Sequence, residues 1–220
     1  MKRCDHESHF FLRLINKKLV NATKREELLS KMRQMDQDQL VKDCLKQKSE
    51  AQRLLYELFA PSMLGVCFRY TKSLHDAEEV LQEGFIKVFT RLQQFKGDGE
   101  LGGWIRKIMV NSALNFLKTN QKYRYDLSFE DSPLHLVSTE NPEVNLDAKE
   151  LAELIRQLPT GFQTIFNLHA VEGYKHAEIA TMLGISEGTC RSQYSRARVL
   201  LIEWIEKFSL KKQNGHYGTK

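Results

Sequence analysis

The segment from Leu158 to Leu201, LPTGFQTIFNLHAVEGYKHAEIATMLGISEGTCRSQYSRARVLL, decides the fold class of this 220-residue chain. Ile179 and Leu183 are spaced as the inward face of a short helix. Gly184 follows, where a tight turn needs a residue without a Cβ, and Ser186 is placed as the N-cap of a second helix. The segment therefore predicts a helix-turn-helix.

The second helix of the pair is apolar on one side and rich in Arg, Ser and Thr on the other. Its apolar positions recur at three- and four-residue spacing: Cys190, Tyr194, Ala197, Leu201, Trp204, Ile205 and Phe208. The polar positions on the other faces are Thr189, Arg191, Ser192, Ser195, Arg196 and Arg198. A helix of this kind suits the major groove of DNA, although an ordinary amphipathic surface helix has the same division.

The composition sets limits on partners and compartment. The chain has 33 Lys and Arg against 28 Asp and Glu, a net charge of +5, which favours a nucleic-acid partner only where the charge is clustered. A hydrophobic fraction of 41% suffices for the cores of one or two domains. No apolar run approaches the length of a membrane span, and no signal-type core follows the basic N-terminus. We expect a cytoplasmic protein with no membrane partner.

The cysteines do not predict a metal centre. They are far apart in sequence: Cys4, Cys44, Cys67 and Cys190. We expect them to be reduced, small side chains of the cores. Cys4, His6 and His9 form at most a partial metal site, because a fourth ligand is missing. We therefore expect no metal and no cofactor.

The predicted fold is all-α: two small helical domains joined by a flexible linker, the second a helix-turn-helix (winged-helix-like DNA-binding) domain. Proline is rare, and helical periodicity runs through most of the chain. The segment around Pro133 and Pro142 lacks that periodicity. The predicted parts are an N-terminal helical extension (1–38), a first domain (39–118), a linker (119–145), the helix-turn-helix domain (146–208) and a polar tail (209–220).

The first domain contains two strongly periodic helices. One is predicted from Asp76 to Leu92, with Asp76 and Glu79 spaced as in a capping box. The next begins near Leu101, and its outer face presents Lys107, Asn111 and Asn115 four residues apart. Such a polar ridge is usually just solvated. Asn is a weak helix former, however, and amides beside a basic side chain suit contacts with DNA.

The loop before the second helix contains Gly97, Gly99 and Gly102, a literal G-x-G-x-x-G match. Helices flank it, whereas a dinucleotide site needs a preceding strand and a βαβ unit. A loop with an aromatic residue, Phe95, beside a basic ridge is better suited to holding an unstacked base of a single strand. The chain has no P-loop, H-E-x-x-H or G-x-S-x-G motif, and we expect no enzymatic activity.

Three blocks together resemble the extracytoplasmic-function (ECF) group of bacterial RNA polymerase sigma factors. The first two are LLYELFAPSMLGVCFRYTKSLHDAEEVLQEGFIKVFTRLQQFKG and WIRKIMVNSALNFL. The third is G-x-x-x-x-E-I-A followed by L-G-I-S-E-G-T-x-R-S-x-x-S-R-A-R. Their order and spacing extend the resemblance from about Leu40 to Lys207. It implies that residues 39–118 are sigma region 2 and residues 146–208 sigma region 4.

The resemblance implies three binding surfaces. Polar contacts to the clamp helices of the polymerase largest subunit would come from Asp76, Glu79, Gln82 and Glu83. The minus-ten promoter element would be recognised and melted by Phe95, Lys96, Gly97, Trp104, Lys107, Asn111 and Asn115. The minus-35 element would be read by Thr189, Arg191, Ser192, Ser195 and Arg196.

The family also implies partners beyond promoter DNA, both double- and single-stranded. They are core RNA polymerase, including its flap, and an anti-sigma factor, and the linker would run toward the RNA exit channel. Family members often have Ser-Tyr where this chain has Lys175-His176, so the residues of the usual phosphate contact are absent there. Residues 1–38 are a further departure. They form either a solvated or self-docking helical extension or, as the apolar stripe that includes Phe10 and Leu14 suggests, an arm for an extra partner.

Two other functions compete with this interpretation. A stand-alone helix-turn-helix regulator with a sensory domain needs neither the 76–92 helix nor the helix that contains Trp104. An enzyme acting on a nucleotide through the glycine loop predicts dinucleotide binding, which a thermal-shift screen tests.

Overall fold

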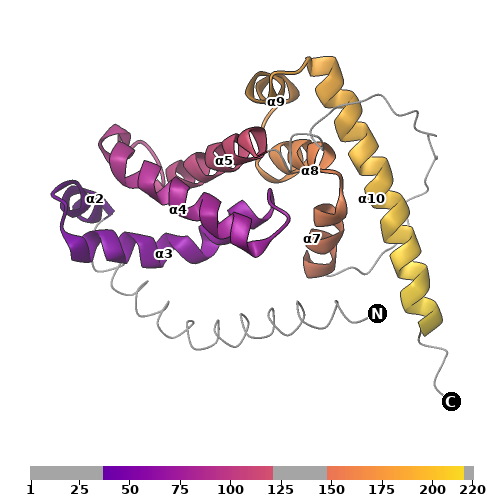
Figure 1. The fold of residues 1–220 in the computed structure, drawn as a ribbon, viewed down its shortest axis with the longest axis horizontal. Helices are drawn as coiled ribbons and strands as arrows, with labels where there is room; N and C mark the ends of the chain where they lie inside the picture. The colour runs from indigo at the N-terminus through magenta and orange to yellow at the C-terminus, as the bar shows by residue number, and fades with distance from the viewer. Residues whose placement is uncertain (1–36, 121–147, 216–220) are drawn as a thin grey trace. The chain divides into compact units, whose positions relative to one another are not determined.

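The computed structural model describes residues 37–120 and 148–215, and these residues contain helices and no strand (Figure 1). The all-α prediction is confirmed. Most of the extension, the linker and the last residues lie outside the described residues, as does the partial metal site at Cys4, His6 and His9. The helices are α2 (Gln37–Leu45), α3 (Ser49–Phe68), α4 (Leu74–Arg91), η1 (Leu92–Gln94), α5 (Leu101–Thr119), α7 (Ala148–Gln157), α8 (Thr160–Phe166), η2 (Asn167–Val171), α9 (His176–Leu183) and α10 (Glu187–Gly215).

The chain forms two compact units that divide α3, α4 and α5 between them. Unit 1 comprises residues up to Leu64 together with Leu81–Met109. Unit 2 comprises Gly65–Val80 and residues from Val110 onward. Each unit has its own buried apolar side chains and is considered by itself.

In unit 1, α4 and α5 pack closely around a glycine. A Cβ at Gly84 would collide with the side chain of Met109, so the absence of a side chain permits this approach. Phe85 packs against Tyr56 of α3, with ring centroids 4.7 Å apart. The face of α4 that contains Gly84 and Phe85 is therefore buried, and the opposite face is exposed.

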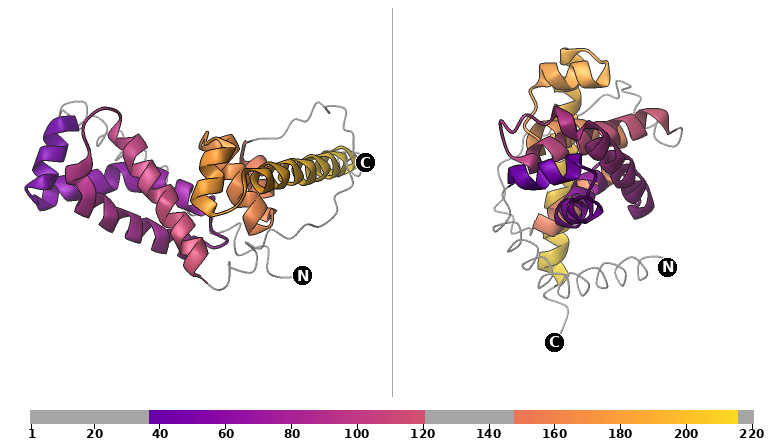
Figure 2. Two further views of the ribbon diagram at one scale, coloured as in Figure 1. Left: turned by 90° about the horizontal axis from the view of Figure 1, so that it is seen from above. Right: turned by 90° about the vertical axis from the view of Figure 1, so that its left-hand side faces the viewer.

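In unit 2, α7, α8 and α9 gather along α10 (Figures 1 and 2). Leu154, Leu158, Ala197 and Leu201 form a buried cluster between α7 and α10, with Trp204 packed against it. The apolar spacing noted in the sequence of α10 is therefore its buried face, and the opposite face stays exposed.

Two predicted boundaries are wrong. Helix α4 begins at Leu74 rather than Asp76, because the Ser73 hydroxyl accepts the Asp76 main-chain N–H at 3.1 Å and caps the helix. Helix α10 continues to Gly215, past residue 208, into the segment predicted to be a polar tail.

In the described part of the chain, no helix is long and apolar enough to cross a membrane. Cys44, Cys67 and Cys190 are buried and free, as predicted. Burial raises the pKa of Cys44 to about 11 and that of Cys67 to about 12, so both thiols are protonated at neutral pH.

Candidate DNA and polymerase interfaces

The predicted helix-turn-helix is present, with α9 and α10 as its helices. Gly184 adopts a left-handed conformation at φ +72°, and its N–H donates to Ala180 O at 2.9 Å. The Ser186 hydroxyl accepts the Thr189 main-chain N–H at 2.9 Å, so Ser186 caps α10. Both residues act as the sequence predicted.

The predicted minus-35 residues lie along the first turns of α10 with unequal exposure. Arg191, Ser192 and Ser195 are exposed, whereas Thr189 and Arg196 are half-buried. Thr189 Oγ1 lies 2.8 Å from the Ser186 hydroxyl, and it therefore takes part in the cap. Of the five predicted residues, Arg191, Ser192 and Ser195 are therefore the most accessible to a ligand.

Arg191 is held in place by an acidic neighbour. Its Nη2 lies 2.6 Å from Glu187 Oε1, one helical turn earlier. An exposed pair of this kind contributes little to stability. It does orient the guanidinium, which would have to leave Glu187 before it could pair with another acceptor.

A group of rings joins η2, α9 and α10 beside this face. His169 of η2 and His176 of α9 stack with ring centroids 4.1 Å apart, and Tyr194 meets His169 edge-on at 4.6 Å. Cys190 Sγ lies 3.5 Å from His176 Nδ1. Burial, followed by the effects of His169 and Arg191, lowers the pKa of His176 below its usual range.

Sequence reasoning noted the unusual His176 but missed the cluster. Its members come from three separate elements and follow no common period, so no sequence pattern links them.

The predicted minus-ten residues lie on α5 and in the loop before it. Phe95 packs against Trp104, with ring centroids 5.7 Å apart, and both rings are half-buried. Lys96 and Gly97 are exposed, and Gly97 has φ +78°, a conformation that favours glycine. The ridge residues Lys107, Asn111 and Asn115 are all exposed on α5.

The predicted polymerase contacts lie on α4. Glu79, Gln82 and Glu83 are exposed, and Glu83 Oε1 lies 2.6 Å from Lys87 Nζ. Asp76 is half-buried in the first turn.

Sequence reasoning missed Ile86, which is 64% exposed on the same helix. Its signal was its register: Ile86 follows Glu79 by seven residues and Gln82 by four, which places it on their face. Ile86 therefore adds an exposed apolar side chain to the C-terminal end of this polar face.

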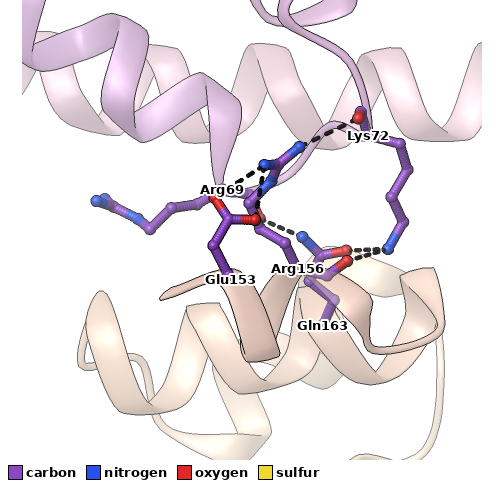
Figure 3. A network of polar contacts seen from close by, with 5 residues as sticks. All are labelled: Arg69, Lys72, Glu153, Arg156 and Gln163. Carbon is purple, nitrogen blue, oxygen red and sulfur yellow. Dashed lines mark hydrogen bonds and ion pairs between the residues drawn. The ribbon is translucent and has the colours of Figure 1, made fainter. Parts of the chain in front are cut away.

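In unit 2, the connection between α3 and α4 is held by polar contacts from α7 and α8 (Figure 3). Lys72 Nζ donates to the carbonyls of Arg156 at 2.9 Å and Leu158 at 2.7 Å, and to Gln163 Oε1. Gln163 Nε2 donates to Arg69 O at 2.8 Å. The lysine thereby satisfies carbonyls at the end of α7, where no helical partner remains.

Two family models match the chain. Sigma-70 region 2 matches residues 55–123, and sigma-70 region 4 matches residues 148–201. The RNA polymerase sigma-H factor of Pseudomonas aeruginosa is 30% identical over 75% of this chain and 91% of its own length. The ECF RNA polymerase sigma-E factor of Haemophilus influenzae is 28% identical over 79% of this chain and 97% of its own length.

A solved structure of the sigma factor RpoE from Bartonella quintana, in complex with the anti-sigma factor NepR, covers 70% of this chain and 96% of that chain. Its sequence identity is 20% and its TM-score 0.45. The sequence relatives and the two family models carry the assignment: this chain belongs to the ECF group of RNA polymerase sigma factors.

Proposed function

We propose that this ECF sigma factor divides promoter-directed initiation among three surfaces, on α10, α5 and α4. The factor binds core RNA polymerase and directs it to promoters, as its family does. It acts by recognition and by promoting DNA melting, while the polymerase supplies the catalytic chemistry. A stand-alone regulator would leave the matched region 2 without a role.

The first surface is the exposed face of α10, proposed to bind the minus-35 element. Arg191 is suited to bidentate contact with guanine or phosphate, and Ser192 and Ser195 to contacts with either base edges or phosphates. Thr189 and Arg196 flank this face. Lys175, exposed immediately before α9, adds a cation where relatives often have serine.

The second surface comprises the loop at Phe95–Gly97 and the ridge of α5, proposed to bind and melt the minus-ten element. Asn111 and Asn115 offer amide groups to base edges, and Lys107 offers a cation to phosphate. The paired rings of Phe95 and Trp104 support the exposed Lys96 and Gly97 at the edge where an unstacked base is to be captured.

The third surface is the exposed face of α4, proposed to dock on the clamp helices of the polymerase. Its acidic residues, Glu79 and Glu83, favour a basic partner surface. Ile86 is exposed about one turn beyond Gln82 and Glu83 on the same face, so we assign it as the apolar anchor of this contact. The flap of the polymerase is the proposed partner of region 4.

Two further partners are proposed from the family and the sequence. An anti-sigma factor would restrain the protein by covering the surfaces that bind polymerase. Residues 1–38 would engage an additional protein. A factor with these partners acts in the cytoplasm, where polymerase and promoter DNA are found.

The observation that carries the proposal is the coexistence of α4, α5 and the capped α9–α10 pair in one chain matched by sigma regions 2 and 4. The test is transcription from a promoter library by core polymerase, with and without the protein. New discrete start sites that share two spaced elements are the expected result. Polymerase binding without new starts would mean that another protein must bring the complex to DNA. No binding and no starts would overturn the proposal.

The anchor is tested by replacing Ile86 with serine. Loss of this apolar contact should weaken binding to core polymerase by about tenfold or more, the cost of a moderate interface hot spot. Leu45→Ser is the matched control, because Leu45 is likewise an exposed apolar side chain, 47% exposed, but belongs to α2. Equal affinities for the two variants would show that Ile86 is not the anchor.

A further inference from the structure

The rings of His169, His176 and Tyr194, here called the aromatic joint, link three helical elements next to the proposed minus-35 surface. We propose that the aromatic joint is a proton-sensitive switch on minus-35 recognition, holding α9 against α10 when both imidazoles are neutral and loosening when they take up protons. This inference rests on the proposed role of α10, and it concerns how that role is regulated.

The geometry makes the joint a structural link. The His169 and His176 rings stack at 4.1 Å with planes 21° apart. Tyr194 lies 4.6 Å from His169 and 5.4 Å from His176, measured between ring centroids. His176 is the first residue of α9, and Tyr194 lies on the half-buried side of α10. The contact between the two helices of the motif therefore includes the histidine pair.

The hydrogen bonds define the neutral state of the pair. His169 Nδ1 lies 2.8 Å from Tyr174 O. A carbonyl only accepts, so Nδ1 carries the proton and Nε2 is left to take up another. His176 Nδ1 faces the Cys190 thiol, whose burial raises its pKa and keeps it a donor. A proton on His176 Nδ1 would remove that S–H···N contact.

The surrounding charges mostly oppose protonation. The imidazole of His169 and the guanidinium of Arg191 on α10 both disfavour a cation at His176, whereas the carboxylate of Glu187 on α10 favours it. The N-terminal end of α9, where His176 lies, has the positive end of the helix dipole. Two imidazolium rings stacked at this distance would repel each other, so the second proton has to separate them.

The sign of the pH effect follows from linkage. The pKa of His176 in the folded chain is lowered from its ordinary value of 6.5. Between the two values, the unfolded chain binds more protons than the folded chain. The stabilising effect of the joint is therefore complete above about pH 6.5 and is lost as pH falls through the folded pKa. Minus-35 recognition should weaken in the same acidic range.

The first experiment is an NMR titration of histidine ring protons in the full chain. His176 is expected to titrate below 6.5, the ordinary value for histidine, because burial and the neighbouring groups lower its pKa. The variant His176→Tyr, which keeps a ring but no imidazole, identifies the His176 signal by its absence. A pKa of 6.5 or higher for His176 would overturn the proposal.

The second experiment measures function with assembled holoenzyme. Footprinting of the minus-35 element on a promoter selected by this holoenzyme is compared at about pH 7.5 and about pH 5.5. Relative to His176→Tyr, the parent should lose about threefold or more in occupancy at the lower pH, because protonation of the histidine pair opposes the packed form of the joint. His75→Gln, the matched control, should behave like the parent.

His169→Phe provides a second test in case His176→Tyr folds poorly, because phenylalanine keeps the stack without the charge. Equal pH dependence in the parent and in both joint variants would overturn the switch. Failure of all the proteins to bind polymerase would instead overturn the proposed function, while the NMR titration would still decide whether the joint is proton-sensitive.

Discussion

Gln193 is the residue whose chemistry agrees least with its surroundings. It lies on the buried side of α10, fully enclosed, and neither its amide oxygen nor its amide nitrogen has a hydrogen-bond partner. An unsatisfied buried polar group costs about 1–3 kcal/mol. The variant Gln193→Met should therefore raise the free energy of unfolding by roughly that amount, measured by urea denaturation of the full chain.

Gln82→Met is a suitable control, because Gln82 is exposed on α4 and its replacement should change stability by no more than about 0.5 kcal/mol. A lower free energy of unfolding for Gln193→Met would show that the buried amide makes a stabilising hydrogen bond after all.

The N-cap of α10 can be tested by removing one atom, the hydroxyl oxygen of Ser186. Its hydroxyl accepts the Thr189 N–H, so Ser186→Ala should lower the free energy of unfolding by about 1 kcal/mol. Ser186→Asp keeps an acceptor at the N-cap and should stay close to the parent. Equal melting temperatures for the alanine variant and the parent would argue that another group replaces the cap.

Single residues also show how far the sequence could be interpreted. Gly184 and Ser186 were predictable because a left-handed turn and an N-cap each demand a particular side chain. Ser73 was overlooked because Asp76 and Glu79 form an equally good local pattern. The partners of His176 were missed because contacts between distant elements decide them, and local periodicity does not contain such contacts. Ile86 was overlooked although its register with Glu79 and Gln82 was visible in the sequence.

At the scale of the element, two glycines within helices allow two effects to be compared: a close contact that leaves no room for a side chain, and the low helix propensity of glycine. A Cβ at Gly84 would meet the Met109 side chain, whereas one at Gly65 of α3 meets nothing within 4 Å. Gly84→Ala should destabilise the protein by up to about 1 kcal/mol, because the Met109 thioether, which is flexible but fully buried, has to shift. Gly65→Ala should stabilise it by about 0.5–1 kcal/mol, because alanine is the better helix former.

Thermal unfolding of the two glycine variants measures this contrast in one experiment. A shift of the melting temperature in the same direction for both would mean that Met109 moves aside and that the α4–α5 approach does not depend on glycine.

The helices themselves were largely predictable, whereas their ends and interruptions were not. Period alone located α4, α5 and α10. It did not separate α2 from α3, whose junction contains Gln47 in a left-handed conformation at φ +56°. It also did not predict that α10 would reach Gly215. Helices persist or stop through packing and capping as well as through local pattern.

At the scale of the whole molecule, the order of the two sigma regions was predictable, and the polar contacts of unit 2 were not. Lys72 and its acceptors are separated by 84 to 91 positions in the sequence. No local pattern predicts such pairs. The mild charge excess of +5 remains a prediction of weak DNA binding by the chain alone.

That charge leads to a prediction about the free protein. Without polymerase to fix the spacing of its two DNA-binding surfaces, the chain should bind promoter and scrambled DNA with similar affinity. Its binding should weaken steeply between about 50 and 200 mM salt, since phosphate contacts dominate nonspecific binding. Fluorescence anisotropy at several salt concentrations measures both properties. If Arg191 contacts a phosphate, Arg191→Ala should reduce the slope of log affinity against log salt by about 0.9. Tight, sequence-specific binding by the free chain would contradict the requirement for polymerase.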